Sequence, residues 1–296
     1  MERHTPSGTS YAFVRPGDVV SHPVDDGLSN GLEVAVYAGR EQGAIHLETA
    51  VATLAPNGTI AGHTHPFEES FYILEGRGLV AIGDVSYELR AGDFGFAPLA
   101  YPHAWNNPFE EPLVWLRVRS PQPRPIGKSH GNYPFADLDP PSAGRPITAE
   151  SVGQRFVGHF DDSQLPPPGP LSMPGYHGYN IRNVSVRMMV DELLGAQHHT
   201  LFVVEFIPST VEGMSAKEHF HPFEETYYFT AGAAEGRVGG EPCSVGKGDL
   251  VFAGVNTSHG FTNLGDVPVR WIEAQAPKPP PSNGTIFEAD WMALEG

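Results

Sequence analysis

Two stretches of the sequence decide the fold: HTHPFEESFY at residues 63–72 and HFHPFEETYY at residues 219–228. The two stretches are 156 positions apart (219 − 63 = 156). The same interval separates GDFGFA (92–97) from GDLVFA (248–253) and EPLVWL (111–116) from VPVRWI (267–272). A repeat of this length indicates a duplicated domain, since the units of solenoid proteins are only about 20–50 residues long. The chain is therefore expected to contain two copies of one domain.

Four residues that can bind a metal recur in both copies. They are His63, His65, Glu69 and His103 in the first and His219, His221, Glu225 and His259 in the second. Side chains two apart in a strand project to the same face, so the first three of each set are expected together, and the last arrives on another strand. Neutral imidazoles and one carboxylate suit a divalent first-row metal and leave two octahedral positions open. The sequence predicts one such metal per domain, and Fe, Mn, Ni, Cu, Co and Zn are all compatible with these ligands.

Strand signals dominate the rest of the repeat. Apolar or alternating runs rich in β-branched and aromatic residues are separated by turns that contain glycine, as in FYILEG (71–76), GLVAIGD (78–84), VSYELRAGD (85–93) and LVWLRVR (113–119). The 34 Gly and 29 Pro residues fit many turns between short strands. The pattern is typical of meandering antiparallel strands and predicts an all-β fold.

The two predicted domains comprise residues 1–145 and 146–296, joined by a proline-rich connector at about 120–175. Proline cannot donate a backbone hydrogen bond, so this connector is expected to have limited structure of its own. Three short helices are predicted on capping and composition signals: YPFADLD (133–139), ITAESVGQRF (147–156) and FEADWMAL (287–294).

The spacing of these residues resembles the two conserved motifs of the cupin superfamily. The first half has His-x-His-x3-Glu-x6-Gly at 63–76 and Gly-x5-Pro-x4-His-x3-Asn at 92–107. Ala100 stands where the second motif usually has Gly, and the second half has Gly254 and Asn256 in place of the usual Pro and Gly. The chain thus resembles a bicupin. The resemblance implies a double-stranded β-helix barrel, similar to a jelly roll, in each half, with the metal inside the barrel mouth.

Neighbours of the ligands are candidates for the pocket. Phe71 and Tyr227 share strand parity with the Glu ligands, while Trp105 and Phe261 follow the last His at even spacing. These four are expected to line the substrate pocket, although an aromatic side chain at such a position is more often simply core. Strand parity turns the remaining neighbours, Glu68 and Glu224, away from the metal, which favours a solvated or interdomain contact.

Among enzymes, the resemblance favours a metal-dependent dioxygenase acting on a small enolisable or phenolic oxygen substrate, since the bicupin quercetinases perform such chemistry with a similar quartet. In this scheme Glu69 or Glu225 is either a ligand or the base that takes the substrate proton. Two alternatives stay open: a metal-dependent hydrolase or isomerase, such as a bicupin similar to ureidoglycine aminohydrolase, and a non-catalytic small-molecule-binding bicupin. Oxalate decarboxylases usually carry an Arg before the first His, and residues 59–62 and 215–218 contain none.

The amino-acid composition limits the classes of binding partner that are expected. With 18 Lys plus Arg against 35 Asp plus Glu, the formal net charge is −17, which repels nucleic acid and anionic membranes and leaves a small-molecule substrate as the expected partner. The single cysteine, Cys243, and the absence of an apolar leader predict a cytoplasmic protein. Because cupin barrels often pair through their outer sheets, the resemblance also implies a homodimer.

Overall fold

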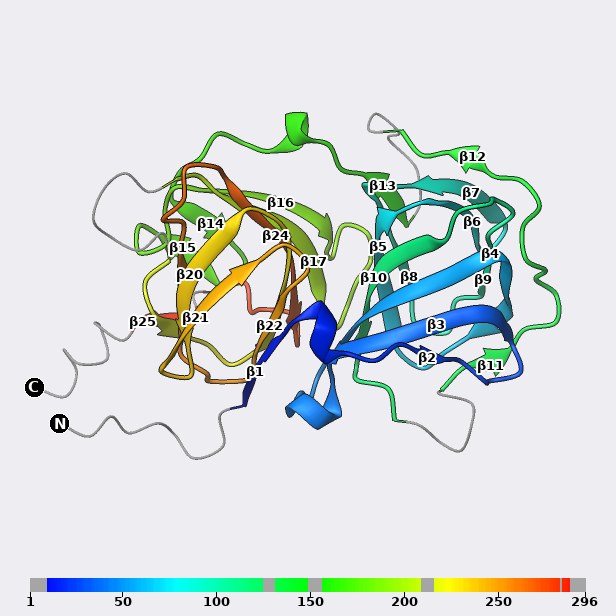
Figure 1. Ribbon diagram of the computed structural model, residues 1–296, viewed down its shortest axis with the longest axis horizontal. Coiled ribbons are helices and arrows are strands. Elements are labelled where there is room, and N and C mark those ends of the chain that lie inside the picture. The colour runs from blue at the N-terminus through cyan, green and yellow to red at the C-terminus, as the bar shows by residue number, and fades with distance from the viewer. Residues whose placement is uncertain (1–9, 125–130, 149–155, 209–215, 283, 288–296) are drawn as a thin grey trace, which may run out of the picture.

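Two β-barrels lie side by side along the long axis of the molecule (Figure 1). This computed structural model describes residues 10–124, 131–148, 156–208, 216–282 and 284–287. Within these ranges the helices are single 3-10 turns, namely η1 (Pro16–Asp18), η2 (Arg40–Gln42) and η3 (Asp162–Gln164). Everything else that is regular is strand, so the predicted all-β fold with one barrel per half is confirmed.

The first barrel is one twelve-stranded sheet centred on β4 (Glu48–Thr64), a strand of 17 residues. The early part of β4 pairs with β10 and its end pairs with β9, so a single strand contributes to opposite walls. The remaining strands of this sheet are β2 (His22–Pro23), β3 (Ser29–Ala38), β5 (Glu68–Glu75), β6 (Arg77–Ile82), β7 (Val85–Arg90), β8 (Asp93–Ala97), β9 (His103–Asn106), β10 (Leu113–Ser120), β11 (Tyr133–Pro134), β12 (Arg145–Pro146) and β13 (Val157–His159).

The second barrel is built from two sheets of six and five strands. The six-stranded sheet contains β1 (Tyr11–Val14), β16 (Val184–Val190), β17 (Thr200–Phe206), β19 (Glu224–Ala231), β22 (Leu250–Ala253) and β24 (Val269–Ala276). The five-stranded sheet contains β18 (His219–Phe220), β20 (Ala233–Val238), β21 (Glu241–Gly246), β23 (His259–Thr262) and β25 (Ile286–Phe287). A separate hairpin of β14 (Leu171–Met173) and β15 (Tyr176–Gly178) stands beside this barrel.

The barrels exchange strands. The first strand of the chain, β1, pairs antiparallel with β22 of the second barrel, as Figure 1 shows in dark blue. In return, β13 lies beyond residue 145 in the sequence but pairs with β8 of the first barrel. The division between residues 1–145 and 146–296 stays a prediction, and each side of it contributes one strand to the barrel of the other.

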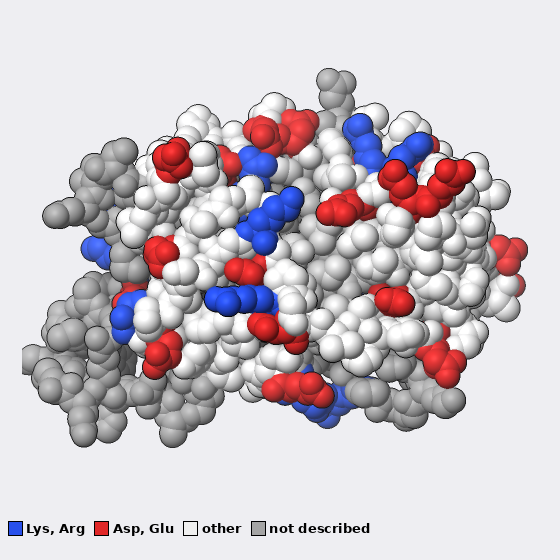
Figure 2. All heavy atoms as spheres, in the orientation of Figure 1, with Lys and Arg blue, Asp and Glu red and all other residues white. Residues whose placement is uncertain are grey.

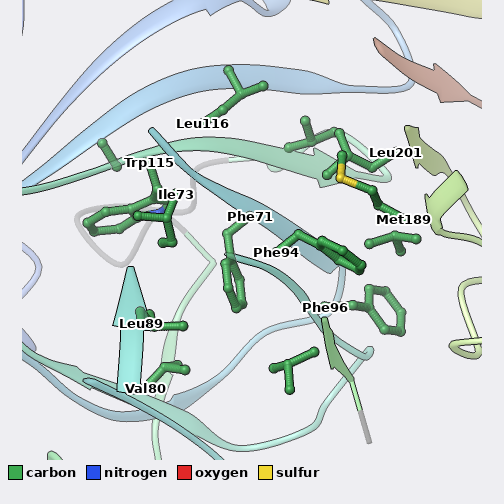
Figure 3. Close-up of a cluster of buried hydrophobic side chains, with 14 of the residues drawn as sticks. Phe71, Ile73, Val80, Leu89, Phe94, Phe96, Trp115, Leu116, Met189 and Leu201 are labelled. Carbon is green, nitrogen blue, oxygen red and sulfur yellow. The ribbon is translucent and has the colours of Figure 1, made fainter. Parts of the chain in front are cut away.

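The apolar core of the first barrel continues into the contact between the barrels. Trp105 and Trp115 stack inside the first barrel with ring centroids 4.8 Å apart. The same cluster of buried side chains includes Met189 and Leu201 of the second barrel. Figure 3 shows these two side chains close to Phe94, at the edge of the first barrel. Burying apolar surface from both sides makes the pair of barrels one packed unit.

The connector differs in part from the prediction. Tyr133–Pro134 forms β11, which pairs with the end of β4, and a turn follows it, so the helix predicted over 133–139 is wrong. A short strand there satisfies backbone groups at the barrel edge, which outweighs a weak local helix preference. For the other two predicted helices, residues 149–155 and 288–294 lie outside the described residues, and Phe287 belongs to β25.

The face seen in Figure 2 carries acidic side chains over both barrels, with basic ones scattered among them. The view shows no continuous basic patch, in keeping with the net charge of −17. None of the helices in the described ranges is long and apolar enough to cross a membrane. The absence of nucleic acid and membrane partners stays a prediction.

Candidate metal centres

In each barrel the first and last histidines face one another across a strand ladder. His63, near the end of β4, pairs directly with His103 at the start of β9. The second barrel repeats this register, with His219 of β18 opposite His259 of β23. Directly opposed residues in antiparallel strands have Cβ atoms about 4.5–5.5 Å apart. The ladder therefore brings together residues that are about forty positions apart in the sequence.

The second His and the Glu of each set do not lie on the same strand as the first His. β4 ends at Thr64, the chain bends at Pro66, and β5 begins at Glu68, so Glu69 stands on the next strand. The expectation that the first three ligands share one strand face is therefore wrong in detail. Proline lacks the backbone N–H that a continuing ladder needs, which explains the bend. The side chains still converge because the two strands belong to one barrel.

Each barrel brings three buried imidazoles together. A nitrogen from each of His63, His65 and His103 lies within 4.8 Å of the others, and the same holds for His219, His221 and His259. The first three are at most 3% exposed. Burial lowers the pKa of His63 to about 3 and those of His65 and His103 to about 4. At neutral pH these imidazoles are uncharged, which is the form that binds a metal.

Backbone carbonyl groups fix the orientation of all six rings. In the first barrel the Nδ1 atoms of His63, His65 and His103 lie 2.8, 2.6 and 3.1 Å from the carbonyl oxygens of Ala61, Phe67 and Tyr101. The second barrel repeats these contacts from His219, His221 and His259 to Lys217, Phe223 and Thr257. In a neutral ring Nδ1 must then carry the hydrogen, because a carbonyl oxygen only accepts. Every Nε2 is left with a lone pair for a metal.

Two phenylalanines that the sequence analysis missed support the central histidine. The ring of His65 stacks on Phe67 with centroids 4.1 Å apart, and His221 stacks on Phe223 at 3.7 Å. Each contact joins a ring to the residue two positions later, across the bend after the proline. The repeated HPF sequence was the signal that could have identified them.

The donor atoms fit a metal ion. The Nε2 atoms of His65, His103, His221 and His259 are buried and lack hydrogen-bond partners. In the second barrel Glu225 Oε2 lies 2.9 Å from Nε2 of His221 and 3.0 Å from that of His259. Lone pairs at this separation repel unless a cation lies between them, and two donors bound at right angles to one cation at about 2.1 Å are about 3.0 Å apart. These residues therefore suit a divalent cation.

Glu69 of the first barrel has a different partner. Its Oε2 accepts a hydrogen bond of 2.6 Å from Nε of Arg119 and lies 4.0 Å from Nε2 of His65. Burial alone would raise the pKa of Glu69, but the guanidinium groups of Arg119 and Arg117 lower it well below its ordinary value. Arg117 itself pairs with Glu48 at 3.3 Å. The first site thus has two guanidinium groups beside its carboxylate.

Neutral and acidic groups surround Glu225 in the second barrel. Gln275 Nε2 donates to Glu225 Oε1 at 2.7 Å, and the hydroxyl of Tyr227 donates to Glu225 Oε2. Glu273 accepts from Trp271 Nε1 at 2.9 Å and from Gln275 Nε2 at 3.1 Å. Burial and the neighbouring charge of Glu225 raise the pKa values of Tyr227 and Glu273 well above their ordinary values. This site is a network of hydrogen bonds without a guanidinium group.

A cavity opens at the second site. Its lining includes the three histidines, Glu225, Tyr227, Glu273 and Gln275. The rest is mostly apolar and comes largely from β14 to β17, with side chains such as Leu171, Val184, Phe202 and Val204. The predicted pocket residues Tyr227 and Phe261 line this cavity. Their counterparts in the first barrel pack in the core, where Phe71 meets Trp105 edge to face at 4.9 Å.

Glu68 and Glu224 join the barrels. The carboxylate of Glu68 accepts from the backbone N–H groups of Gln197 and His198 at 2.8 and 2.9 Å. That of Glu224 accepts from Ile45, His46 and Leu47 at 2.6, 2.8 and 3.3 Å. Both are at most 1% exposed, so the interdomain contact is observed and the solvated alternative is wrong. Each strand that carries a ligand carboxylate is thereby fixed to a loop of the other barrel.

The asparagines that follow the last His are structural. Asn107 donates to the carbonyl oxygens of Leu54, Ala55 and Glu111, and Asn263 donates to those of Phe206 and Val267. Both side chains are fully buried. They satisfy backbone groups of the turn after the strand, away from the cavity lining.

The cupin domain model matches residues 50–119 and 206–274, which contain one His triad each. The chain belongs to the bicupins. A curated relative of this bicupin is the tetracenomycin polyketide synthase protein TcmJ of Streptomyces glaucescens, which is 31% identical over 96 residues. That segment covers 31% of this chain and 62% of TcmJ, so the alignment spans less than two thirds of the relative.

Solved structures support the fold of the whole bicupin. A formate complex of oxalate decarboxylase from Lactobacillus farciminis has a TM-score of 0.62 at 18% identity and covers 95% of this chain and 90% of that one. A putative glyoxylate-induced protein from Pseudomonas aeruginosa has a TM-score of 0.63 at 16% identity, over 90% and 89% of the two chains. The protein Ylba of E. coli has a TM-score of 0.62 at 13% identity, over 91% and 92%. At these identities the likeness shows the architecture only.

The residues that distinguish the two sites were missed in the sequence. Arg117 and Arg119 follow Trp115 at every second position of β10, and Glu273 and Gln275 stand at the corresponding places after Trp271 on β24. A polar residue at every second position of an otherwise apolar strand places those residues on one face. That alternation was the available signal.

Proposed function

We propose that this bicupin is a metal-dependent dioxygenase acting on a small enolisable or phenolic substrate, with the reactive site in the second barrel. The observation that carries the proposal is the cavity, which joins an oriented His triad and Glu225 to apolar walls. A bound divalent metal would supply a Lewis acid that favours an ionised substrate oxygen and a redox centre for dioxygen. The partial relative TcmJ, named as a polyketide synthase protein, adds support, since polyketides are rich in enolisable carbonyl groups.

The protein groups have distinct roles in this proposal. The imidazoles of His219, His221 and His259 would hold the metal, and Glu225 would accept the proton that the substrate hydroxyl loses. The hydroxyl of Tyr227 and the amide of Gln275 hold Glu225 in position. Both oxygen atoms of dioxygen enter the product, and the substrate supplies all four electrons. No other reductant is required.

The test starts with metal content and oxygen uptake. The purified chain should contain two metal ions, and flavonols, catechols or diketones added without air should bind. On aeration we expect one dioxygen to be consumed for each molecule of one such substrate. A chain that contains zinc and consumes no oxygen would instead support the hydrolase or isomerase alternative. Binding without turnover would support a non-catalytic binding protein.

A further inference from the structure

The cavity of the second barrel lacks a cationic side chain. Among the described residues that line it, none is Lys or Arg. Its polar groups are the histidines, the carboxyl groups of Glu225 and Glu273, the hydroxyls of Tyr176, Tyr227 and Thr285, the Trp271 indole and the Gln275 amide. Apart from a metal, nothing in this lining can neutralise an anionic ligand at neutral pH.

The first barrel differs at matching places in its sheet. Arg119 of β10 pairs across the ladder with Glu69, and Arg117 pairs with Phe71. In the second barrel Gln275 of β24 pairs with Glu225, and Glu273 pairs with Tyr227. The registers agree, so two guanidinium groups in one barrel are replaced by an amide and a carboxyl group in the other. The substitution changes charge without changing the ladder.

This difference limits what the second cavity can bind. A metal stabilises most strongly the ligand atoms that bind it directly, because Coulomb attraction falls with distance. A second anionic group on the ligand would enter a lining that has no cation to pair with, and burying an unpaired charge is strongly unfavourable. The carboxyl oxygen atoms of Glu273 and the amide oxygen of Gln275, by contrast, line the cavity and can accept hydrogen bonds from hydroxyl groups of a ligand. The cavity therefore favours an apolar body with hydroxyl groups.

We infer that the second barrel binds a phenol or enol whose body, away from the metal, is uncharged, and that Glu273 and Gln275 determine this charge preference. The inference rests on the proposed function for the location of the reactive site. It predicts weak binding in this barrel for ligands that carry an anionic group which cannot reach the metal.

Two probes of nearly equal size test the inference. 4-Methylcatechol and 3,4-dihydroxybenzoate both bind a metal through adjacent hydroxyl groups and differ in a methyl group against a carboxylate. Their dissociation constants would be measured without air, on metal-loaded protein, by the change in tryptophan fluorescence. To restrict binding to the second barrel, the first triad is disabled by His103→Ala. We expect 4-methylcatechol to bind at least about ten-fold more tightly, because its methyl group needs no counter-charge. Equal or reversed affinities would overturn the inference.

Variants then test the two residues. The double variant Glu273→Arg with Gln275→Arg transfers the pair of the first barrel to the second and should shift the ratio of the two affinities at least about ten-fold towards the benzoate. The milder Glu273→Gln, which has nearly the same size, should shift the ratio in the same direction. Glu241→Gln makes the same substitution at an exposed position outside the cavity lining and should leave the ratio unaltered.

Metal content and thermal unfolding are measured for each variant, so that a lost site is not mistaken for a changed preference. If the double variant does not fold, the ratio in Glu273→Gln decides, and an unchanged ratio there overturns the role of Glu273. Because binding is measured without air, failure of the proposed dioxygenase reaction would leave these affinities unaffected. Failure of the inference can therefore be distinguished from failure of the proposed function.

Discussion

Strands β10 and β24 occupy the same place in the two barrels and give the same histidine triad different surroundings. In the first barrel the carboxylate of Glu69 is bound by Arg119, with Arg117 nearby. In the second barrel Glu225 is held by neutral donors and lies about 3 Å from two imidazole nitrogens. The carboxylate of the first site is partly neutralised by the protein, whereas that of the second is directed at the metal position.

This difference shows that ligand identity alone does not define a metal site. Hydrogen-bond partners of the ligands tune both metal affinity and reactivity. A guanidinium beside the ligand carboxylate competes with the metal for the same oxygen and repels its positive charge. We therefore expect the second barrel to bind the metal more tightly and to be the one that turns over substrate.

The largest expected effect comes from removing one imidazole in each barrel. His259→Ala and His103→Ala should each reduce the metal content from two ions per chain to one. Only His259→Ala should reduce the rate of substrate-dependent oxygen uptake, by at least about 100-fold, because a metal lowers the activation free energy of such a reaction by several kcal/mol. Metal analysis and an oxygen electrode measure both quantities. If His103→Ala alone abolished turnover, the assignment of the reactive barrel would be wrong.

Removing the interdomain carboxylates should have the next largest effect. Glu224→Ala leaves three backbone N–H groups of the first barrel unpaired, and Glu68→Ala leaves two of the second. Each should lower the free energy of unfolding by about 3 kcal/mol, since breaking buried charged hydrogen bonds costs this much. Denaturant unfolding measures the loss. The exposed Glu241→Ala should change stability by less than about 0.5 kcal/mol, and an equal loss there would refute the special role of the pair.

Exchanging the hydrogen-bond partner of the ligand carboxylate should make the metal affinities of the two sites more similar. Arg119→Gln should raise the metal affinity of the first barrel about ten-fold, and Gln275→Arg should lower that of the second by a similar factor. Arg119→Gln is combined with His259→Ala, and Gln275→Arg with His103→Ala, so that only the altered site binds metal. Competition with a chelator measures the metal affinity. Changes of the same sign in both barrels would contradict the electrostatic explanation.

The smallest effect is expected from the hydroxyl of Tyr227, which is absent at Phe71 in the first barrel. Tyr227→Phe removes one hydrogen bond to Glu225 and should lower the stability of the metal-loaded protein by about 1 kcal/mol. The reverse change, Phe71→Tyr, should give no gain, because Arg119 already binds Glu69. Thermal unfolding of both variants with metal measures the difference. A clear gain from Phe71→Tyr would show that the two carboxylates are more alike than their partners suggest.

Much of the fold and of the metal centres could be predicted because the signals are local. The alternating runs over 71–93 form β5, β6 and β7, as their periodicity of two indicates. The duplicated His and Glu spacing predicted two triads, and the structure brings both together. A short bend and one pair of opposed strand residues are enough to bring each triad together, and both copies of the repeat contain the residues that form them.

Other features could not be predicted because they depend on partners distant in the sequence. The exchange of β1 and β13 between the barrels follows from which sheet edges are free, and edge pairing has no local signature. The contact of Glu68 with Gln197 joins residues of different barrels. Phe71 and Trp105 were both expected to line the pocket, and in the first barrel they pack with Trp115 in the apolar core.

The sequence by itself determined that this protein has two β-domains with three histidines and a glutamate at metal-ligand spacing in each, because residue type and periodicity are properties of the chain. Only the tertiary structure decided that the two sites differ. Arg119 and Gln275 are each fifty residues from the carboxylate they contact, and sheet register alone brings them there. The alternation along each strand shows which residues share a face, but only the sheet register places their charge beside a metal position.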